Sequence, residues 1–475
     1  VPPTERNARR RSADDRPRSL NSLIFSRKQR RPMKLWKWLV GLFFLLVIVD
    51  GALRKWVLPG QSALLFVLKD AVLWGGFLAY ATWRSPTQLP KPLRHTWVPV
   101  LLAGYIALVL VQAFNLRQPN LIVSALGLKA HLAFLPLVVL MPAIIAESTE
   151  RRAIRLLWYY TLLIVLPLVA LSVYQFYQPP SAWINQYVRE MDAIATVAGH
   201  ARVISTFSYV GSHTAYLVFN AFLGIGILLA GFRYHRRDLL LLGGLLFGAT
   251  VVVLPMAGSR GPIVIIAVAL AVLLTVVESR HTGAFRALSI LLILGVVIVQ
   301  VTGLAEGWDA LVERATEAGD TEDRIENVFL SPFYGIERGG LLGYGAGSAH
   351  QAAPRFVPGA FTHEWLPEGY IESAIARQIV ELGSLGWLLL ISLKGWLLYL
   401  AVQTVQRGRR SLEVIVGVTA FCMLLAKLPF PVIYNVVAGA FYWGSAGAML
   451  GVWSLQEVRH KYHQSQREPR RKVHA

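Results

Sequence analysis

Long apolar segments, each close to the length of a membrane-spanning helix, recur along almost the whole chain and are separated by short polar loops. A helix needs about 20 consecutive apolar residues to cross the hydrocarbon core of a bilayer. Together with a hydrophobic content of 55%, the number of these segments excludes a soluble globular fold. The sequence therefore predicts an all-α integral membrane protein.

About twelve transmembrane helices are expected from the apolar runs and the residues that interrupt them. They cover approximately residues 35–50, 63–83, 97–114, 121–146, 153–177, 213–231, 238–256, 262–277, 287–303, 379–402, 412–430 and 434–455. The chain is thus expected to divide into a disordered basic cytoplasmic tail (1–34), spans one to nine with an external loop at 178–212 (35–303), a large external loop (304–378), spans ten to twelve (379–455) and a second basic cytoplasmic tail (456–475).

Basic residues decide the expected orientation. Every loop on the same side as the N-terminal tail contains arginine or lysine, as does the C-terminal tail. Cytoplasmic loops are enriched in these residues, so both termini are expected in the cytoplasm. The net charge of +20 is concentrated in these loops and tails, which indicates orientation and no binding of nucleic acid. Met33 stands just before the first span, and whether residues 1–32 belong to the native protein is left open.

One external segment combines many ionisable residues with the start of an apolar span. It reads THEWLPEGYIESAIARQIVELGSLGWLLL, residues 362–390, and includes His363 and Glu372. Ionisable residues in such a place are costly, which favours a functional site. An ordinary loop that leads into a helix is the alternative. Gly383 and Gly386, three residues apart, would allow close helix packing.

Cations at the outer side of the spans form a second pattern. Lys69, Lys129, Lys427 and Arg260 are expected in the outer half or at the outer mouth of their spans. Together they would suit a multiply charged anion such as a lipid pyrophosphate. For any single cation, snorkelling to the interface or pairing with an aspartate, Asp50 or Asp70, is the alternative.

Two short motifs add detail. MAGSRGP, residues 256–262, places Arg260 among small residues where Pro262 begins the next helix. Backbone N–H groups and the positive end of the helix dipole would favour an anion there. GGLLGYGAGSAH, residues 339–350, has no surrounding βαβ unit and is expected outside the cell, which excludes a nucleotide site. Its glycines predict flexible turns that let the backbone approach a ligand.

In their order and placement, these features resemble the bacterial O-antigen ligase and O-antigen polymerase superfamily. The resemblance rests on the twelve-span layout, GSRG at 258–261, the large late external loop, GYGAG at 343–347 and ELGSLGW at 381–387. It covers most of residues 200–400. DGALRKWVLP, residues 50–59, is also similar to the N-terminal signature of a polymerase-like subgroup.

The resemblance implies a GT-C-like glycosyltransferase of the bacterial inner membrane, without metal or other cofactor. Its partners would be the lipid bilayer, an undecaprenyl-pyrophosphate-linked glycan donor and other polysaccharide-export or chain-length proteins. We expect a polysaccharide polymerase, in which an acceptor hydroxyl attacks the anomeric carbon of the donor on the outer face. The alternatives are a ligase that transfers the glycan to lipid A-core or another acceptor, and a transporter or flippase for lipid-linked sugar or a small anion. A transporter is disfavoured because the chain shows no internal repeat and its intramembrane charges lie toward the outside.

The resemblance also suggests site residues. The family's ligases place a histidine eleven residues before the glycine of Gly-x-x-Gly, and counting back from Gly383 gives Glu372 in this chain. Glu372 is therefore the preferred catalytic residue, with His363 second, and a simple ion pair of Glu372 with Arg377 or a nearby lysine is the alternative. The expected pyrophosphate ligands are Arg260, Arg324, Arg202, Arg377, Lys129 and Lys427.

Overall fold

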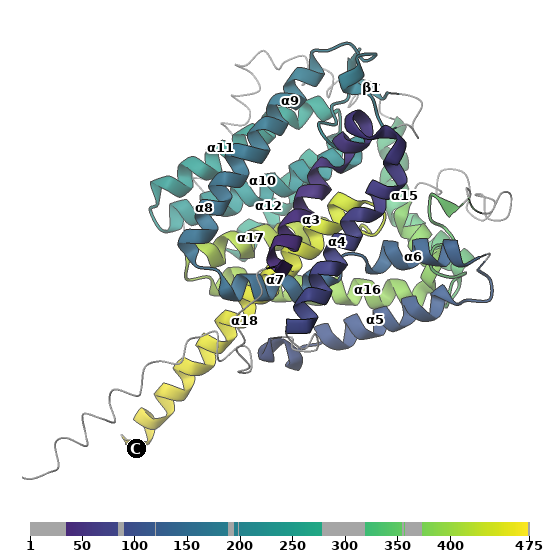
Figure 1. Cartoon of the computed structure of the whole chain (residues 1–475). Coiled ribbons are helices and arrows are strands. Elements are labelled where there is room, and N and C mark those ends of the chain that lie inside the picture. Colours follow the sequence, from purple (N-terminus) through teal and green to yellow (C-terminus); the bar gives the residue numbers. More distant parts are fainter. Residues whose placement is uncertain are drawn as a thin grey trace, which may run out of the picture.

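The computed structural model describes residues 35–83, 90–118, 120–188, 194–197, 199–277, 319–353, 356 and 373–473. Their regular structure is almost entirely helical (Figure 1), which confirms the predicted all-α class. Among these residues, one short antiparallel pair of strands, β1 (Thr196–Val197) and β2 (His200–Ala201), is the exception.

The helices follow the order of the predicted spans. They are α3 (Leu35–Ala52), α4 (Ser62–Trp83), α5 (Val98–Ala113), α6 (Leu121–Leu132), α7 (Pro136–Glu147), α8 (Glu150–Tyr160), α9 (Leu166–Phe176), α10 (Val210–Arg233), α11 (Arg237–Val253), α12 (Arg260–Val276), α15 (Gly319–Gly339), α16 (Ala374–Arg407), α17 (Ser411–Ala426) and α18 (Val436–Val473). Short π-helical turns occupy Leu53–Val57 and Thr161–Val165, and 3₁₀ turns occupy Pro59–Gln61, Lys91–His95, Trp183–Asn185 and Pro255–Ala257.

Within the described residues, eight helices are long and apolar enough to cross a membrane. They are Leu35–Val57, Pro59–Thr82, Leu121–Glu147, Glu150–Phe176, Val210–Arg233, Arg237–Ala257, Ala374–Arg407 and Val436–Ser465. Three shorter apolar helices, Val98–Ala113, Gly261–Val276 and Ser411–Ala426, coincide with further predicted spans. The predicted span at 287–303 lies outside the described residues.

Two helices form the centre of the bundle. Of their membrane-length windows, 83% is buried in α10 and 94% in α18, against 17% in the segment that contains α8 and α9. Small residues allow the close packing of α10, because a Cβ on Gly224 or Gly243 would press into the facing helix. Helix α18 packs against α7, α16 and α17 and continues to Val473, so most of the predicted C-terminal tail is helical.

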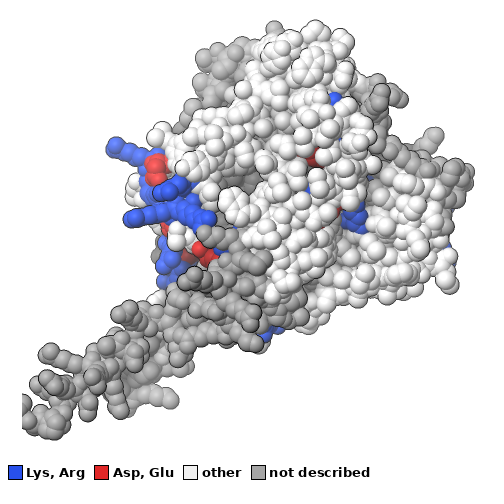
Figure 2. Space-filling view, viewed as in Figure 1, with Lys and Arg blue, Asp and Glu red and all other residues white. Residues whose placement is uncertain are grey.

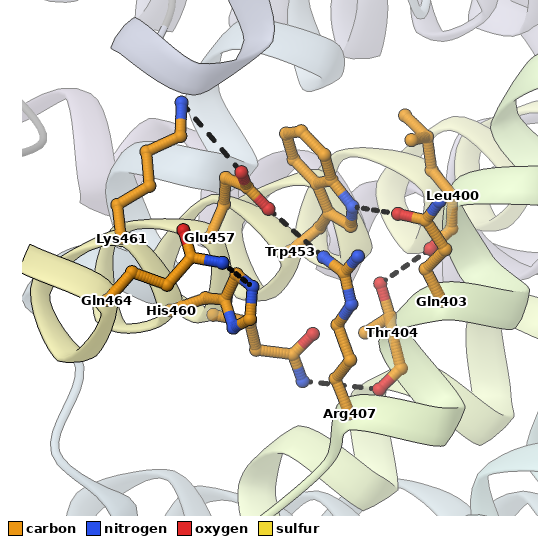
Figure 3. Close-up of polar contacts among 10 residues, drawn as sticks. Leu400, Gln403, Thr404, Arg407, Trp453, Glu457, His460, Lys461 and Gln464 are labelled. Carbon is orange, nitrogen blue, oxygen red and sulfur yellow. Dashed lines mark hydrogen bonds and ion pairs between the residues drawn. The ribbon is translucent and has the colours of Figure 1, made fainter. Parts of the chain in front are cut away.

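Charged side chains gather at one end of the bundle. Figure 2 shows them as blue and red atoms on the side of α8 and α11. Figure 3 shows Arg407 of α16 reaching Glu457 of α18, with 3.0 Å between the paired atoms. Further ion pairs are Arg236 with Glu150, Arg459 with Glu413, and Lys37 of α3 with Glu147 of α7. Basic loops that were predicted to share one side of the membrane therefore lie near one another.

Candidate functional site

Helix α16 is interrupted inside the bundle. Its backbone leaves the helical conformation at Gly383, where φ is +70° and ψ is 177°. Such a break leaves N–H and C=O groups without helical partners, which is costly away from water. The glycine-rich segment 340–345 supplies the missing partners. Four hydrogen bonds join the two segments, from Ser384 N–H to Gly340 O (2.9 Å), Leu385 N–H to Leu341 O (3.2 Å), Tyr344 N–H to Val380 O (2.8 Å) and Gly345 N–H to Glu381 O (3.0 Å).

Glycines make this contact possible. At Gly383, a Cβ would overlap the carbonyl of Leu341, and the positive φ would strain any other residue. On the other side of the segment, Gly127 of α6 and Gly347 meet so closely that a Cβ on either would overlap backbone atoms. In the structure the glycines of GYGAG thus let the backbone approach α16 and α6, whereas the sequence suggested an approach to a ligand. At Gly383 the close neighbour is likewise a loop, around Leu341, and not the packed helix that the sequence suggested.

The end of α5 and the turn after it hold the same segment from outside. The N–H of Ala346 donates to the carbonyl of Gln112 at 3.1 Å, and the side-chain amide of Gln118 donates to the carbonyl of Ala346 at 2.6 Å. Three N–H groups of the segment, from Tyr344 to Ala346, are therefore occupied by protein carbonyls. The segment serves as a packed wedge between α5, α6 and α16.

A pair of buried ionisable side chains lies at this wedge. Nε2 of His131, on α6, is 2.7 Å from a carboxylate oxygen of Glu381, on α16, and both side chains have an exposed fraction of 0%. The hydroxyl of Tyr105, on α5, lies 2.7 Å from Nδ1 of the same histidine. Both ring nitrogens of His131 are thus occupied, one by Tyr105 and the other by Glu381. Three helices are thereby joined through one imidazole.

Three more polar side chains border this pair. Tyr434, in the turn before α18, lies close to Glu381 and is buried with it. The guanidinium of Arg377 is 5.4 Å from the centre of the Tyr434 ring. The ring of His350 also contacts the Tyr434 ring, edge to face, with 6.1 Å between ring centres. Tyr105, His131, His350, Arg377, Glu381 and Tyr434 are called the buried polar cluster below.

Electrostatics in the buried polar cluster favour a neutral His350. Burial lowers the pKa of His350, and the positive charges of Lys129, His131 and Arg377 act in the same direction, while Glu381 opposes them. The cluster can hold a proton between His131 and Glu381 and present Arg377 to an anion. Among the described residues, no group of three or more His, Cys, Asp or Glu side chains is placed to hold a metal ion.

Several predicted site residues lie outside this description. Glu372 and His363 are outside the described residues. The described chain resumes at Ser373, whose hydroxyl caps α16 by accepting from the N–H of Ala376. Arg260 begins α12 and Arg324 belongs to α15, but their side chains are also outside the description. Chain connectivity alone puts Glu372 next to the helix start that contains Arg377.

Arg202 lies beside the GSRG motif, as a shared anion site would require. Its Nε donates to the carbonyl of Ala257 at 3.1 Å, and the N–H of Val203 donates to the carbonyl of Met256 at 3.3 Å. The motif itself turns at Gly258, where φ is +59°. Two sequence segments that were both predicted to contact pyrophosphate therefore run next to each other.

The N-terminal signature packs against the chain that follows Arg202. Nζ of Lys55 donates to the carbonyl of Ser205 at 2.8 Å, and its side chain is buried. Gly51 lies so close to the backbone around Phe207 that a Cβ would overlap it. Lys55 therefore stabilises this loop, a structural role that interfacial anchoring alone does not describe.

Of the two lysine candidates, Lys129 has a side-chain partner, and Lys427 has a contact through its backbone carbonyl. Lys129 forms an ion pair with Asp70, with 3.2 Å between Nζ and the carboxylate, which is the alternative that the sequence left open. Lys427 follows α17, and its carbonyl accepts from Nζ of Lys394 at 2.9 Å. Of the four predicted pyrophosphate ligands whose side chains are described, only Arg377 is placed in the buried polar cluster, with Lys129 near enough to act on His350.

Sequence reasoning missed most of the buried polar cluster. Glu381 was part of the polar stretch but received no role, and His131 and His350 were not considered. One signal was available, because a histidine inside an apolar span, two residues after Lys129, is itself unusual. A comparison with protein-family models finds no match for the chain, and neither does a comparison with curated protein sequences.

Proposed function

We propose that the protein is a polysaccharide polymerase that joins undecaprenyl-pyrophosphate-linked glycan units on the outer face of the bacterial inner membrane. The observation that best supports this is the contact between GYGAG and ELGSLGW. The N–H groups of Tyr344 and Gly345 in the first motif donate to the carbonyls just before the break in α16. The residues that lead into this motif, Gly340 and Leu341, accept from the N–H groups just after the break. The break adjoins Arg377 and Glu381, at the start of a helix preceded by the proposed catalytic Glu372.

The proposed topology has about twelve spans, a large external loop before α16 and both termini in the cytoplasm. Charged groups gathered at one end of the bundle support this orientation, because that end contains the loops expected in the cytoplasm. The start of α16 then belongs to the outer half of the protein.

In the proposed reaction, the acceptor hydroxyl attacks the anomeric carbon of the donor glycan. Glu372 accepts the hydroxyl proton as the new C–O bond forms, and His363 is the second candidate for this role. The bond from the anomeric carbon to the pyrophosphate breaks, and the polyprenyl pyrophosphate leaves with the electron pair. Arginine guanidinium groups stabilise the charge that develops on it, because they form paired hydrogen bonds with phosphate oxygens. The proposed ligands are Arg202, Arg260, Arg324 and Arg377.

The His131–Glu381 pair has a positioning role in this proposal. Arg377 and Glu381 lie four residues apart on the first part of α16, so they occupy neighbouring turns. Fixing Glu381 to α6 through His131 therefore fixes the helical turn that presents Arg377 and follows Glu372.

Complementation of a strain that lacks the protein tests the proposal. Wild type, Glu372→Gln and Arg377→Gln are compared at matched membrane levels, with Arg409→Gln as a control for an exposed arginine on the other side of the bundle. We expect single-unit glycan in the null strain, a restored ladder with wild type and the control, and no ladder with the two site variants. Full-length polymer left on the lipid carrier in the null strain would indicate a ligase. Normal polymer with both site variants would contradict the site.

A further inference from the structure

Five ionisable side chains from α3, α4, α6 and the π-helical turn after α3 form a second group, called the charge ladder here. Arg54 and Lys69 lie 3.7 Å and 3.5 Å from the same carboxylate oxygen of Asp50. Lys129 lies 3.2 Å from Asp70. The ring of Phe66 faces all three cations, which places Arg54, Lys69 and Lys129 around one side chain.

The charges of the ladder do not balance. Within the described structure, three cations share two carboxylates. Two of the cations also donate hydrogen bonds to neutral groups. Arg54 Nε donates to the hydroxyl of Ser62 at 2.7 Å, and Lys69 Nζ donates to the carbonyl of Phe66 at 2.9 Å. A surplus positive charge in an apolar surrounding is costly, and a bound anion would remove that cost.

The surroundings indicate where this anion comes from. The side chains of Lys129 and Arg54 are exposed to 20% and 11%, so the ladder can be reached from outside. Apolar side chains on the same helices are more exposed, with 63% for Leu64 of α4 and 75% for Leu121 of α6. Figure 2 accordingly shows isolated blue and red atoms within an otherwise white face. Such a face on membrane-length helices contacts lipid, so the anion is expected to arrive within the bilayer.

We propose that the charge ladder binds the phosphate of an anionic membrane lipid between Arg54 and Lys129. Guanidinium and ammonium groups donate charge-assisted hydrogen bonds to phosphate oxygens, while Asp50 and Asp70 compete for the same cations. The lipid's acyl chains would lie along the apolar faces of α4 and α6. This proposal does not rest on glycan transfer, because it concerns binding alone.

Native mass spectrometry of the full chain in detergent tests the proposal. The protein is titrated with phosphatidylglycerol and with diacylglycerol, a matched lipid without phosphate. We expect phosphatidylglycerol to bind at least tenfold more tightly than diacylglycerol. The double variant Arg54→Gln/Lys129→Gln should lose this preference, and Arg409→Gln should keep it. Inorganic phosphate at the same concentration should not displace the lipid.

A second variant is expected to bind the lipid more tightly, a result that misfolding could not produce. Asp70→Asn keeps every cation and removes a competitor, so it should raise the affinity for phosphatidylglycerol severalfold. An unchanged or lower affinity in this variant would overturn the proposal. So would equal binding of the two lipids, or displacement by inorganic phosphate, which would identify a site for free phosphate.

Discussion

The buried polar cluster and the charge ladder are both groups of ionisable side chains inside a bundle of apolar helices, yet they differ in burial and in charge balance. His131 and Glu381 are fully buried and pair at 2.7 Å, with Tyr105 on the remaining ring nitrogen. In the ladder, Lys129 and Arg54 are partly exposed and the cations outnumber the carboxylates. Removing one partner of a fully buried pair destabilises the fold, whereas partly exposed cations at a lipid-facing surface are suited to a ligand.

The largest loss of stability is expected from a substitution at the helix break next to the buried polar cluster. Gly383→Val should prevent stable folding, because valine is strained at a φ of +70° and its Cβ would overlap the carbonyl of Leu341. Gly395→Ala in the same helix is the matched control, since nothing lies within 4 Å of the added Cβ. It should gain up to about 1 kcal/mol. The yield of folded protein and the midpoint of unfolding by denaturant, both in detergent, are measured for the two variants. If Gly383→Val is as stable as Gly395→Ala, the helix break at Gly383 is contradicted.

The next largest effect is expected from the balanced pair. His131→Ala leaves the carboxylate of Glu381 buried without its partner, which should lower the free energy of unfolding by about 3–5 kcal/mol. His131→Ala/Glu381→Ala should cost less than the sum of the single variants, because no unpaired charge remains. Denaturant titration of all three gives the coupling, and additive losses would show that the pair is not a unit.

A substitution in the charge ladder should change the stability of the protein less than one in the buried polar cluster. Lys129→Gln leaves Arg54 and Lys69 against Asp50 and Asp70, which balances the charges. In detergent without anionic lipid, this variant should change the free energy of unfolding by about 1 kcal/mol or less. The same denaturant titration measures it. A loss as large as that of His131→Ala would remove the distinction between the two regions.

The smallest effect concerns pH. Burial lowers the pKa of His350, so the unfolded chain binds a proton more readily than the folded protein. The stability that depends on neutral His350 is therefore present above the unfolded pKa of about 6.5 and is lost as the pH falls below it. Between pH 8 and pH 5, His350→Gln should show a shallower fall in unfolding free energy than wild type. Parallel curves would mean that His350 is not protected from protonation.

Local sequence properties predicted the helices well. Apolar runs fix where a span can lie, and the apolar helices of the described residues coincide with predicted spans. Helix α15 lies instead in the predicted external loop, and α18 continues beyond its predicted span. Finer details depended on single residues. Pro136, which lacks a backbone N–H, begins α7 and separates it from α6 within one predicted span.

The candidate site was less predictable, because its contacts join distant parts of the chain. His131 and Glu381 are 250 residues apart, and neither has a local partner that marks it. The break at Gly383 depends on a loop that arrives from about 40 residues earlier, so helical periodicity could not reveal it. Lys129 and Asp70 were weighed as a pair because each is a charge within an apolar span, which the sequence alone displays.

Glycan transfer by purified protein in proteoliposomes tests the central proposal most directly. With undecaprenyl-pyrophosphate-linked glycan as the only substrate, wild type should lengthen the glycan and release undecaprenyl pyrophosphate in step. Glu372→Gln should reduce both rates by a factor of about 100 to 10,000, as expected when a general base is removed. Unchanged glycan length with wild type, or an equal rate with Glu372→Gln, would contradict the proposed chemistry.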